Sequence, residues 1–597
     1  MMALEQDRSS QSVPETISFT SMTVEAVLYA VLFLIALFLR LFLLDYLPLG
    51  ASEAQQAMAS WNFIHAVPDS FTGSPILFAG NAILFFLFGA TDLAARFLPA
   101  LFGGLLVLIP ALFRHNLGRP GALMASVLMM FSPSLVLFSR QLDGVMVGVT
   151  CTLAAIAFAF RYWNRRESRE LYLAAMACAL AWLSSSQVWT VVLAMIVFFI
   201  IVRLRGETLE IEKKEARNAA LIFVLVVAGV ATMFMLKRDG IGAAFDLLGS
   251  WLDTIRLNGS PLDPLRLLVL YEPIILFFGV VALVELIFEA RYRTWLDSSN
   301  ALMVWGLGVF LLYSFTGEPE PVRVVFVVVP FAMMAGWFIG AWWSRLVDAI
   351  RSVPESKLMI LSQEAPVFSL AIALTIFLSI VVAEFTLRGN LTAAEAMMAN
   401  LRIPITPGSA SVVIVLVLFV LAFSAIAFLA FTTLGFERTG YLGIFLALTL
   451  MTVWTFRQSM MLNFTLVPNA YEWLTPRLAS PNTRDLVRDV ENVSRWRADD
   501  SHTLALVVDD SLGAMAKWSL REFRNARFVV HPRVDERTGA MLLPVNVLAP
   551  AGWIGQEYTL DYVQGNGSTA SVLRWLLYRD VGAVQTINAV LWTPPPQ

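Results

Sequence analysis

The 597-residue chain has few charged side chains: they make up 15% of it, where the surface of a soluble protein needs roughly a quarter. Hydrophobic residues account for 58%, and the mean hydropathy is +0.70. This balance excludes an ordinary soluble protein and a disordered chain. The apolar residues form long unbroken runs rather than alternating with polar ones, which excludes an outer-membrane barrel. The composition therefore indicates a polytopic helical membrane protein.

Residues that hold metals or form disulfides are also scarce. The only two cysteines, Cys151 and Cys178, fall inside apolar runs and are typical of small buried hydrophobes rather than of a disulfide framework. The four histidines are scattered, and no spacing among them is typical of zinc or haem. We therefore expect no cofactor. A divalent cation is compatible with the sequence, but nothing in the sequence indicates one.

The long apolar runs predict the topology. Residues 1–22 are polar and lack the apolar core of a signal peptide, so we expect a cytosolic N-terminal tail. Residues 23–457 predict a transmembrane domain of about thirteen helices. Basic residues gather in alternate loops, which places the N-terminus in the cytosol and the C-terminus outside, in a multi-pass protein of the cell membrane. The predicted spans lie near 23–44, 93–113, 120–138, 145–161, 170–186, 188–203, 218–236, 265–288, 300–315, 322–343, 367–386, 410–432 and 440–457.

Two segments interrupt this pattern. The external loop 45–92 contains an apolar stretch, 74–88, that is too short to span comfortably and is expected to be re-entrant or interfacial. The composition of 458–597 is that of a soluble domain. Its order of elements predicts a small extracytoplasmic α/β domain, without a Gly-rich phosphate loop. We expect strands over 504–508, 527–530 and 543–548, and helices over 512–523 and near 571–578.

The external loop carries a candidate functional group. Ser52, with Gln55 three residues later, has the pattern of a helix N-cap. An apolar face then predicts a helix lying on the membrane surface, formed by Ala54, Ala57, Met58, Trp61 and Ile64. Glu53 is the acid of its first turn. It either complements the helix dipole or supplies a carboxylate that can deprotonate an incoming hydroxyl.

These residues resemble a known family. Arg40-Leu41, Asp45 and Pro48 before Glu53, then Asp92-Leu93-Ala94-Ala95-Arg96-Phe97-Leu98-Pro99, then Phe138-Ser139-Arg140, are similar in order and spacing to the C-type (GT-C) glycosyltransferases. That superfamily includes protein O-mannosyltransferases and lipid A aminoarabinose transferases. Within it, Tyr271-Glu272-Pro273, the run 313–321 and Trp518–Phe523 resemble the flippase-activity-associated proteins. The resemblance implies a GT-C-like membrane enzyme that moves a sugar from a polyprenyl-phosphate donor to a glycan, lipid or protein acceptor on the outer face.

The resemblance also implies roles for individual residues. We expect Glu53 to be the base and Asp143 a second acid, although relatives carry Asp-Glu where this chain has Ser52-Glu53. Arg140 and Arg323 are expected to bind the lipid phosphate, because arginine presents a planar charged fork. The alternative for Arg140 and Asp143 is an interfacial ion pair with each other.

Further ionisable residues have two interpretations each. Glu318 and Arg323 flank two prolines in an external loop that would face the same cavity. Arg96 is a candidate substrate-binding residue, but a structural pair with Asp92 at i, i+4 is the interpretation we favour. Glu272 lies in an apolar run, where an ionisable residue usually has a partner or a function. The alternative is that it faces the outer water layer, since the predicted span starts only a few residues earlier.

Two other functions compete with the transferase. One is a protein that handles lipid-linked sugars or assists a flippase without catalysis, and the serine at position 52 favours it. The other is an ion-coupled transporter, which the lack of evident inverted repeats and of deep charges disfavours. Nothing indicates a nucleic-acid partner.

Overall fold

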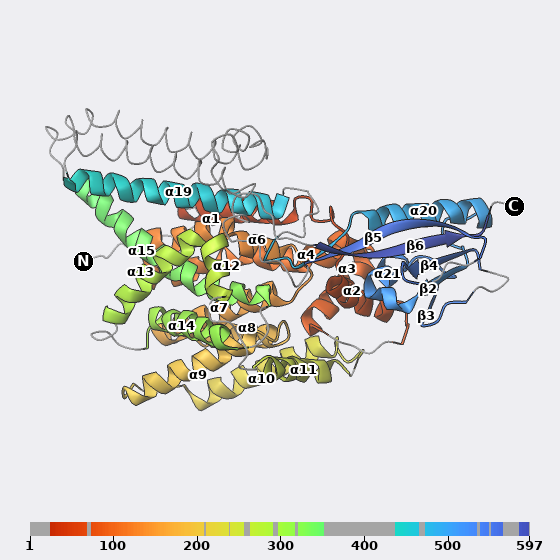
Figure 1. The fold of residues 1–597 in the computed structure, drawn as a ribbon. Helices are drawn as coiled ribbons and strands as arrows, with labels where there is room; N and C mark the ends of the chain where they lie inside the picture. The colour runs from red at the N-terminus through yellow and green to blue at the C-terminus, as the bar shows by residue number, and fades with distance from the viewer. Residues whose placement is uncertain are drawn as a thin grey trace, which may run out of the picture.

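The computed structural model describes the greater part of the chain, in twelve segments. In Figure 1 helices form a bundle, and a domain with a sheet is joined to one end of that bundle. The predicted combination of a mostly helical membrane region and a C-terminal domain with strands is confirmed. The described segments are 24–68, 73–207, 211–237, 239–255, 263–289, 296–316, 320–351, 436–464, 472–533, 538–547, 551–564 and 584–595.

Eighteen helical elements make up the described bundle. In chain order they are α1 (Val24–Leu41), α2 (Ala51–Ile64), α3 (Pro75–Phe88), α4 (Asp92–Leu106), η1 (Ile109–Phe113), α5 (Arg114–Phe131), α6 (Pro133–Ser139), α7 (Val145–Arg165), α8 (Ser168–Trp182), α9 (Val188–Leu204), α10 (Lys213–Ala231), α11 (Gly240–Thr254), α12 (Asp263–Tyr271), α13 (Pro273–Glu289), α14 (Ser298–Phe315), η2 (Pro321–Arg323), α15 (Val324–Arg351) and α19 (Phe436–Phe464).

Several of these helices are long enough to cross a membrane, so the protein is a multi-pass membrane protein. Within the described segments five qualify by length and composition, and six if the pair α12 and α13, bent by 115°, counts as one broken span. The count of thirteen is therefore not confirmed. Two predicted spans, 367–386 and 410–432, lie outside the described residues. Others are short: α8 has 15 residues and α9 has 17.

A close helix crossing sets the geometry of the end of the bundle that meets the C-terminal domain. A Cβ on Gly340 would lie 2.2 Å from the backbone nitrogen of Gly121, and one on Gly336 would lie 2.5 Å from that of Ala125. The backbones of α5 and α15 therefore touch, as small residues permit in membrane proteins. The pairing is antiparallel, so α6, which follows α5, and η2, which precedes α15, lie at the same end.

The C-terminal domain is built on a six-stranded mixed sheet. Its strand order is β1-β5-β6-β4-β2-β3, with β2 parallel to β3 and β4 and the other pairs antiparallel. Apolar side chains of the sheet and of its helices, among them Leu486, Val490 and Leu560, form a core of their own. The elements are β1 (Arg477–Ala479), α20 (Asn482–Ala498), β2 (Leu506–Asp509), η3 (Asp510–Leu512), α21 (Gly513–Ser519), β3 (Arg527–Val529), β4 (Ala540–Pro544), β5 (Ile554–Gln564) and β6 (Val584–Thr593).

The sequence predicted part of this domain. The strands expected over 504–508 and 527–530 are present as β2 and β3, with the parallel pairing that strand–helix–strand order favours. The strand expected over 543–548 lies earlier, as β4, and the helix expected over 512–523 is the shorter α21. The helix expected near 571–578 lies outside the described residues. Helix α20 and the long hairpin of β5 and β6 were not predicted.

Polar contacts hold the C-terminal domain against the segment 45–92. Trp518 Nε1 donates to Asp92 Oδ1 at 2.8 Å, and Arg484 Nη2 lies 3.5 Å from Asp92 Oδ2. The Arg521 guanidinium lies 3.9 Å from the centre of the Trp518 ring and donates to the carbonyl of Ala90. Helix α2 packs against both α3 and α21. The domain therefore rests on the helices of the segment 45–92, at one end of the bundle.

Candidate functional site

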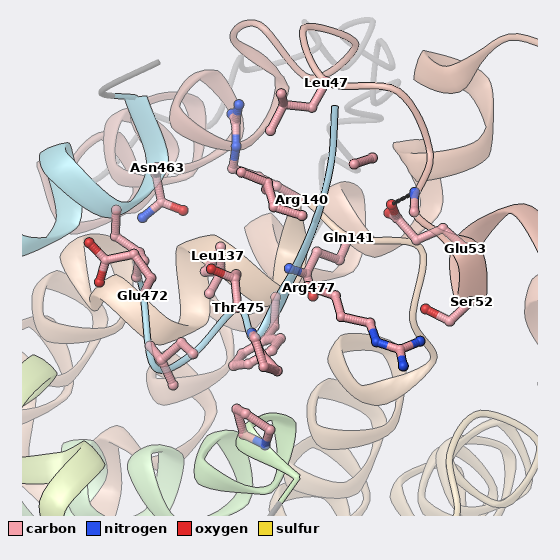
Figure 2. A pocket seen from close by; sticks show the side chains of 18 of the residues that line it. Leu47, Ser52, Glu53, Leu137, Arg140, Gln141, Asn463, Glu472, Thr475 and Arg477 are labelled. Carbon is pink, nitrogen blue, oxygen red and sulfur yellow. Dashed lines mark hydrogen bonds between the residues drawn. The ribbon is translucent and has the colours of Figure 1, made fainter. Parts of the chain in front are cut away.

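A cavity lies where these two regions meet. Its volume is about 460 Å³, and Figure 2 shows side chains entering it from several elements. The loop after α1 and the start of α2 form one side, and the ends of α6 and α19 and the turn η2 form another. The first segment of the C-terminal domain, 472–479, closes it, together with Asp561 of β5. Segments far apart in the sequence therefore build one chamber.

Glu53 and Arg96 form a buried ion pair at one side of this chamber. Arg96 donates from Nε to Glu53 Oε1 at 2.8 Å and from Nη2 to Oε2 at 2.6 Å. The side chain of Arg96 is only 7% exposed and that of Glu53 only 12%. Such a two-pronged contact is the strong form of a charged hydrogen bond. Arg96 therefore pairs with Glu53, and the expected pair with Asp92 is wrong: Asp92 serves Trp518 and Arg484 instead.

The same pair organises the chain around it. Arg96 also donates to the carbonyl oxygens of Leu44, Leu47 and Pro48 at 2.7–3.1 Å. Glu53 accepts from the backbone N–H of Leu142 at 2.7 Å and from that of Gly50 at 2.9 Å. Gly50, rather than Ser52, is therefore the N-cap of α2, which begins at Ala51. One ion pair thus joins the loop after α1, the start of α2 and the loop after α6.

The environment of Glu53 keeps it ionised. Burial alone would raise the pKa of its carboxyl, but the charge and hydrogen bonds of Arg96, with the N–H groups of Gly50 and Leu142, hold the pKa below its usual value. Each carboxylate oxygen already accepts two hydrogen bonds. A carboxylate in this state is a weak proton acceptor, because taking a proton would give up the pair with Arg96.

Arg140 is committed to the backbone in a similar way. Its Nη1 donates to the carbonyl oxygens of Leu39, Arg40 and Phe42, and its Nη2 donates to that of Leu43, at 2.6–3.3 Å. The last carbonyls of a helix have no partner within it, so Arg140 caps the C-terminus of α1. Its guanidinium also lies 5.0 Å from the centre of the Phe464 ring. These contacts replace the expected ion pair with Asp143.

Asp143 lies two residues before the start of α7. Its Oδ1 accepts from the N–H of Val145 at 2.9 Å, at the start of α7. Burial, with the negative charges of Glu320 and Glu53, raises the pKa of this carboxyl. Gly144 permits the tight placement, because a Cβ there would lie 1.7 Å from the carbonyl oxygen of Ser184. Asp143 is half-buried and is not among the residues that line the cavity, but two residues that do line it, Glu320 and Glu53, act on its carboxyl through their charges.

Arg323 lies in a polar network beneath the cavity. It is 6% exposed, and its Nε lies 3.4 Å from Glu320 Oε2. Gln187 Nε2 donates to the same carboxylate oxygen at 3.1 Å, and Tyr313 Oη donates to Gln187 Oε1 at 3.0 Å. Glu320 lines the cavity, so the network reaches it through that carboxylate. Glu318 lies outside the described residues.

The C-terminal domain supplies charged groups that sequence reasoning missed. Arg477, Asp561 and Glu472 all line the cavity. Glu472 accepts from Tyr271 Oη at 2.6 Å. Asp561 is 4% exposed, and its Oδ1 has no hydrogen-bond partner among the described residues. A register shift in β5 between Thr559 and Asp561 breaks the alternation of faces and turns Asp561 inward.

Glu272 has its own hydrogen-bond partners, away from the cavity lining. Its Oε1 accepts from Ser132 Oγ at 2.6 Å and from the N–H of Ser134 at 3.0 Å, at the break between α12 and α13. The predicted choice for Glu272 is thus resolved towards a partnered buried acid. In the described segments no three His, Cys, Asp or Glu side chains are grouped as metal ligands.

The structure therefore brings some of the predicted site residues to one chamber. Glu53, Arg96 and Arg140 line it, whereas Asp143 and Arg323 do not and are linked to it only through the charges of lining carboxylates. Of the residues that the sequence analysis missed, Arg477 could have been noticed as a basic residue that follows Thr475-Pro476 soon after the last predicted span. Asp561 has none, because a register shift places it.

Comparison with known families gives a match over part of the chain. Residues 73–244 match the family model described as dolichyl-phosphate-mannose-protein mannosyltransferase. The match confirms the resemblance to GT-C glycosyltransferases over that segment, which contains Arg96, Arg140 and Asp143. The narrower resemblance to flippase-activity-associated proteins is not confirmed. The comparison with curated proteins gave no match.

Solved structures give weak likenesses over most of the chain. ArnT from Cupriavidus metallidurans in the apo state has a TM-score of 0.48 at 15% identity, covering 83% of this chain and 84% of that one. ArnT bound to undecaprenyl phosphate gives 0.48 at 14%, covering 84% and 85%. The Archaeoglobus fulgidus oligosaccharyltransferase AglB, with an inhibitory peptide and a dolichol-phosphate, gives 0.45 at 13%, covering 84% and 64%.

Proposed function

We propose that this chain is a membrane glycosyltransferase that moves a sugar from a polyprenyl-phosphate donor to an acceptor on the outer membrane face. One observation carries the proposal: the segment matching a family of dolichyl-phosphate-mannose mannosyltransferases contributes Arg96, Arg140 and Gln141 to the cavity. The mixed lining of charged and apolar side chains suits a polar headgroup on a lipid. In this proposal the N-terminus is cytosolic, and the C-terminal domain and cavity face outward.

The chemistry requires a leaving phosphate and a proton acceptor. The bond between the sugar C1 and the phosphate oxygen breaks, and its electron pair leaves with the lipid phosphate. The acceptor hydroxyl oxygen bonds to C1, which has oxocarbenium character, and its proton passes to a carboxylate. Asp143 suits this role better than Glu53, because its pKa is raised and Oδ1 accepts from a single backbone N–H.

Glu53 has the character of a positioning residue. Its four hydrogen bonds join the loop after α1 to the loop that carries Asp143, so it sets the place of the acid rather than taking the proton. Arg140, proposed from the sequence as a phosphate ligand, would have to release four carbonyl oxygens to bind one. Arg323 would act through Glu320, and Glu318 stays a predicted neighbour of the same loop.

A transfer assay with two variants tests this proposal. The full-length protein in lipid nanodiscs is incubated with radiolabelled polyprenyl-phosphate sugars and candidate acceptors. We expect Asp143→Asn to lower turnover by 10²-fold or more, the usual contribution of a general base, with the thermal midpoint unchanged. Full turnover in Asp143→Asn would exclude this residue as the base.

The pH profile sharpens the assignment. The ionised form of Asp143 accepts the proton, so turnover falls as pH drops through the raised pKa of this carboxyl. Glu320→Gln removes one of the negative charges that raise this pKa, and we expect the acid limb of the profile to move to lower pH. An acid limb that stays in place would contradict the coupling.

A non-catalytic function is the second candidate. Ser52, at the position where relatives carry an acid, lines the cavity, and the acid beside it is occupied by Arg96. A protein that binds lipid-linked sugars for another enzyme or a flippase would fit this arrangement. It is favoured if the protein binds donors but consumes none, and if Asp143→Asn leaves that binding unchanged.

A further inference from the structure

Three arginines line the described cavity, and they differ in what their guanidinium groups hold. Arg96 binds Glu53 and three carbonyl oxygens, and Arg140 binds four carbonyl oxygens. Arg477 makes no hydrogen bond and no ion pair within the described segments through its side chain. Five N–H donors in a planar fork are therefore available at the wall formed by the C-terminal domain.

The side chain of Arg477 points into the cavity. It is an exposed residue at the first position of β1, and Figure 2 shows it extending towards Ser52, whereas Arg140 points away from it towards the loop at Leu47. Strand pairing holds the backbone of Arg477 in place, since it lies opposite Val563 in the β1–β5 ladder. The guanidinium is therefore held near the cavity by a fixed backbone, while its N–H groups stay available to bind a ligand.

Asp561, the acid whose charge acts on Arg477, does not occupy the N–H donors of its guanidinium. Asp561 interacts with the charge of Arg477, but it accepts hydrogen bonds from the backbone N–H groups of Leu478 and Tyr562. The other charged groups of the cavity wall have partners: Glu53 has Arg96, Glu320 has Gln187, and Glu472 has Tyr271. Among the described residues of the chamber, an anionic ligand thus finds one guanidinium with open donors, that of Arg477.

We propose that Arg477 binds the phosphate of the polyprenyl-phosphate donor, so that the C-terminal domain completes a substrate site whose other walls are membrane helices. The proposal rests on the proposed function, since it assigns a residue to the donor of that reaction. A guanidinium binds phosphate through two parallel hydrogen bonds. The leaving phosphate would then gain negative charge beside a fixed positive one.

Binding measurements can test this without turnover. The full-length protein is placed in nanodiscs of neutral phosphatidylcholine, and the probes are undecaprenyl phosphate, undecaprenol and inorganic phosphate. We expect Arg477→Ala to weaken binding of undecaprenyl phosphate about 30-fold and to leave undecaprenol unaffected, because a charged bidentate contact is lost. Arg477→Lys keeps the charge but loses the fork, so an intermediate loss of about 5-fold is expected.

Controls separate this inference from the proposed function. Arg488 on α20 is exposed and pairs with Asp485 at 3.3 Å, so Arg488→Ala should change binding less than 2-fold. If wild-type protein binds undecaprenyl phosphate and Arg477→Ala binds it equally, Arg477 is not the phosphate ligand, and the proposed function stands. If wild-type protein neither binds the lipid phosphate nor transfers sugar, the proposed function fails. Competition by inorganic phosphate at equal affinity would overturn the assignment to a lipid headgroup.

Discussion

The two walls of the cavity use their charges differently. On the membrane side, Arg96 and Arg140 hold loops in place, and Glu53 is bound to Arg96 through both oxygens. On the side of the C-terminal domain, the side chain of Arg477 has no hydrogen bond among the described residues, and one carboxylate oxygen of Asp561 has none either. Charged side chains whose hydrogen bonds are all made within the protein stabilise the walls of the cavity, whereas charged side chains without partners are available for a ligand. Charged residues that resemble a family motif can therefore build the site without touching the substrate.

The largest expected effect comes from breaking the membrane-side pair. Glu53→Gln leaves Arg96 buried without its counter-charge, and removing one partner of a buried pair destabilises by about 3 kcal/mol or more. We expect a clear fall in the thermal unfolding midpoint of the protein in nanodiscs. Asp485→Asn is the matched control, since its pair with Arg488 is exposed and should contribute less than about 0.5 kcal/mol. A Glu53→Gln protein as stable as wild type would show that the Glu53–Arg96 pair does not stabilise the fold.

A smaller effect is expected where the two regions are joined. Asp92→Asn weakens the hydrogen bond from Trp518 and the attraction to Arg484, which contribute about 1–2 kcal/mol to docking of the C-terminal domain. Amide hydrogen exchange should then accelerate in 513–523, while exchange within β2 and β4 stays slow. Unchanged exchange in 513–523 would mean that the apolar contacts of Trp518 and α2 suffice to hold the domain.

The smallest effect has the opposite sign and concerns the other wall. Burial raises the pKa of Asp561 from 3.8 to about 6, so the folded protein resists ionisation of this group. The resulting destabilisation is absent below pH 3.8, develops as pH rises towards 6 and is complete above it. We expect Asp561→Asn to stabilise the protein at pH 8 by on the order of 1–2 kcal/mol and to change little at pH 4. Equal effects at the two pH values would contradict a raised pKa.

The sequence contained the signals for much of the fold. Long apolar runs predict membrane helices because each must satisfy its backbone within lipid. The strands 504–508 and 527–530 are apolar and separated by a helical segment, which is sufficient for a parallel pair. The count of spans was less predictable, because polar residues such as Ser184–Ser186 end helices before a full crossing, and a break at Glu272 divides another.

The roles of the site residues depended on three-dimensional partners. Arg96 lies four residues after Asp92, which indicates a local pair, yet the chain places Glu53, 43 residues earlier, closer to it. The capping pattern at Ser52 was equally local, and Glu53 reaching the N–H of Gly50 replaced it. Asp561 and Arg477 enter the cavity through strand pairing and a register shift. Spacing along a sequence does not contain that information.

The most direct test is a structure of the full-length protein in nanodiscs with undecaprenyl phosphate bound. The difference between the two walls predicts the phosphate within hydrogen-bond distance of Arg477, with Arg96 still on Glu53 and Arg140 still on the carbonyls after α1. A phosphate bound instead by Arg140 or Arg96, with those backbone contacts released and Arg477 in solvent, would contradict it.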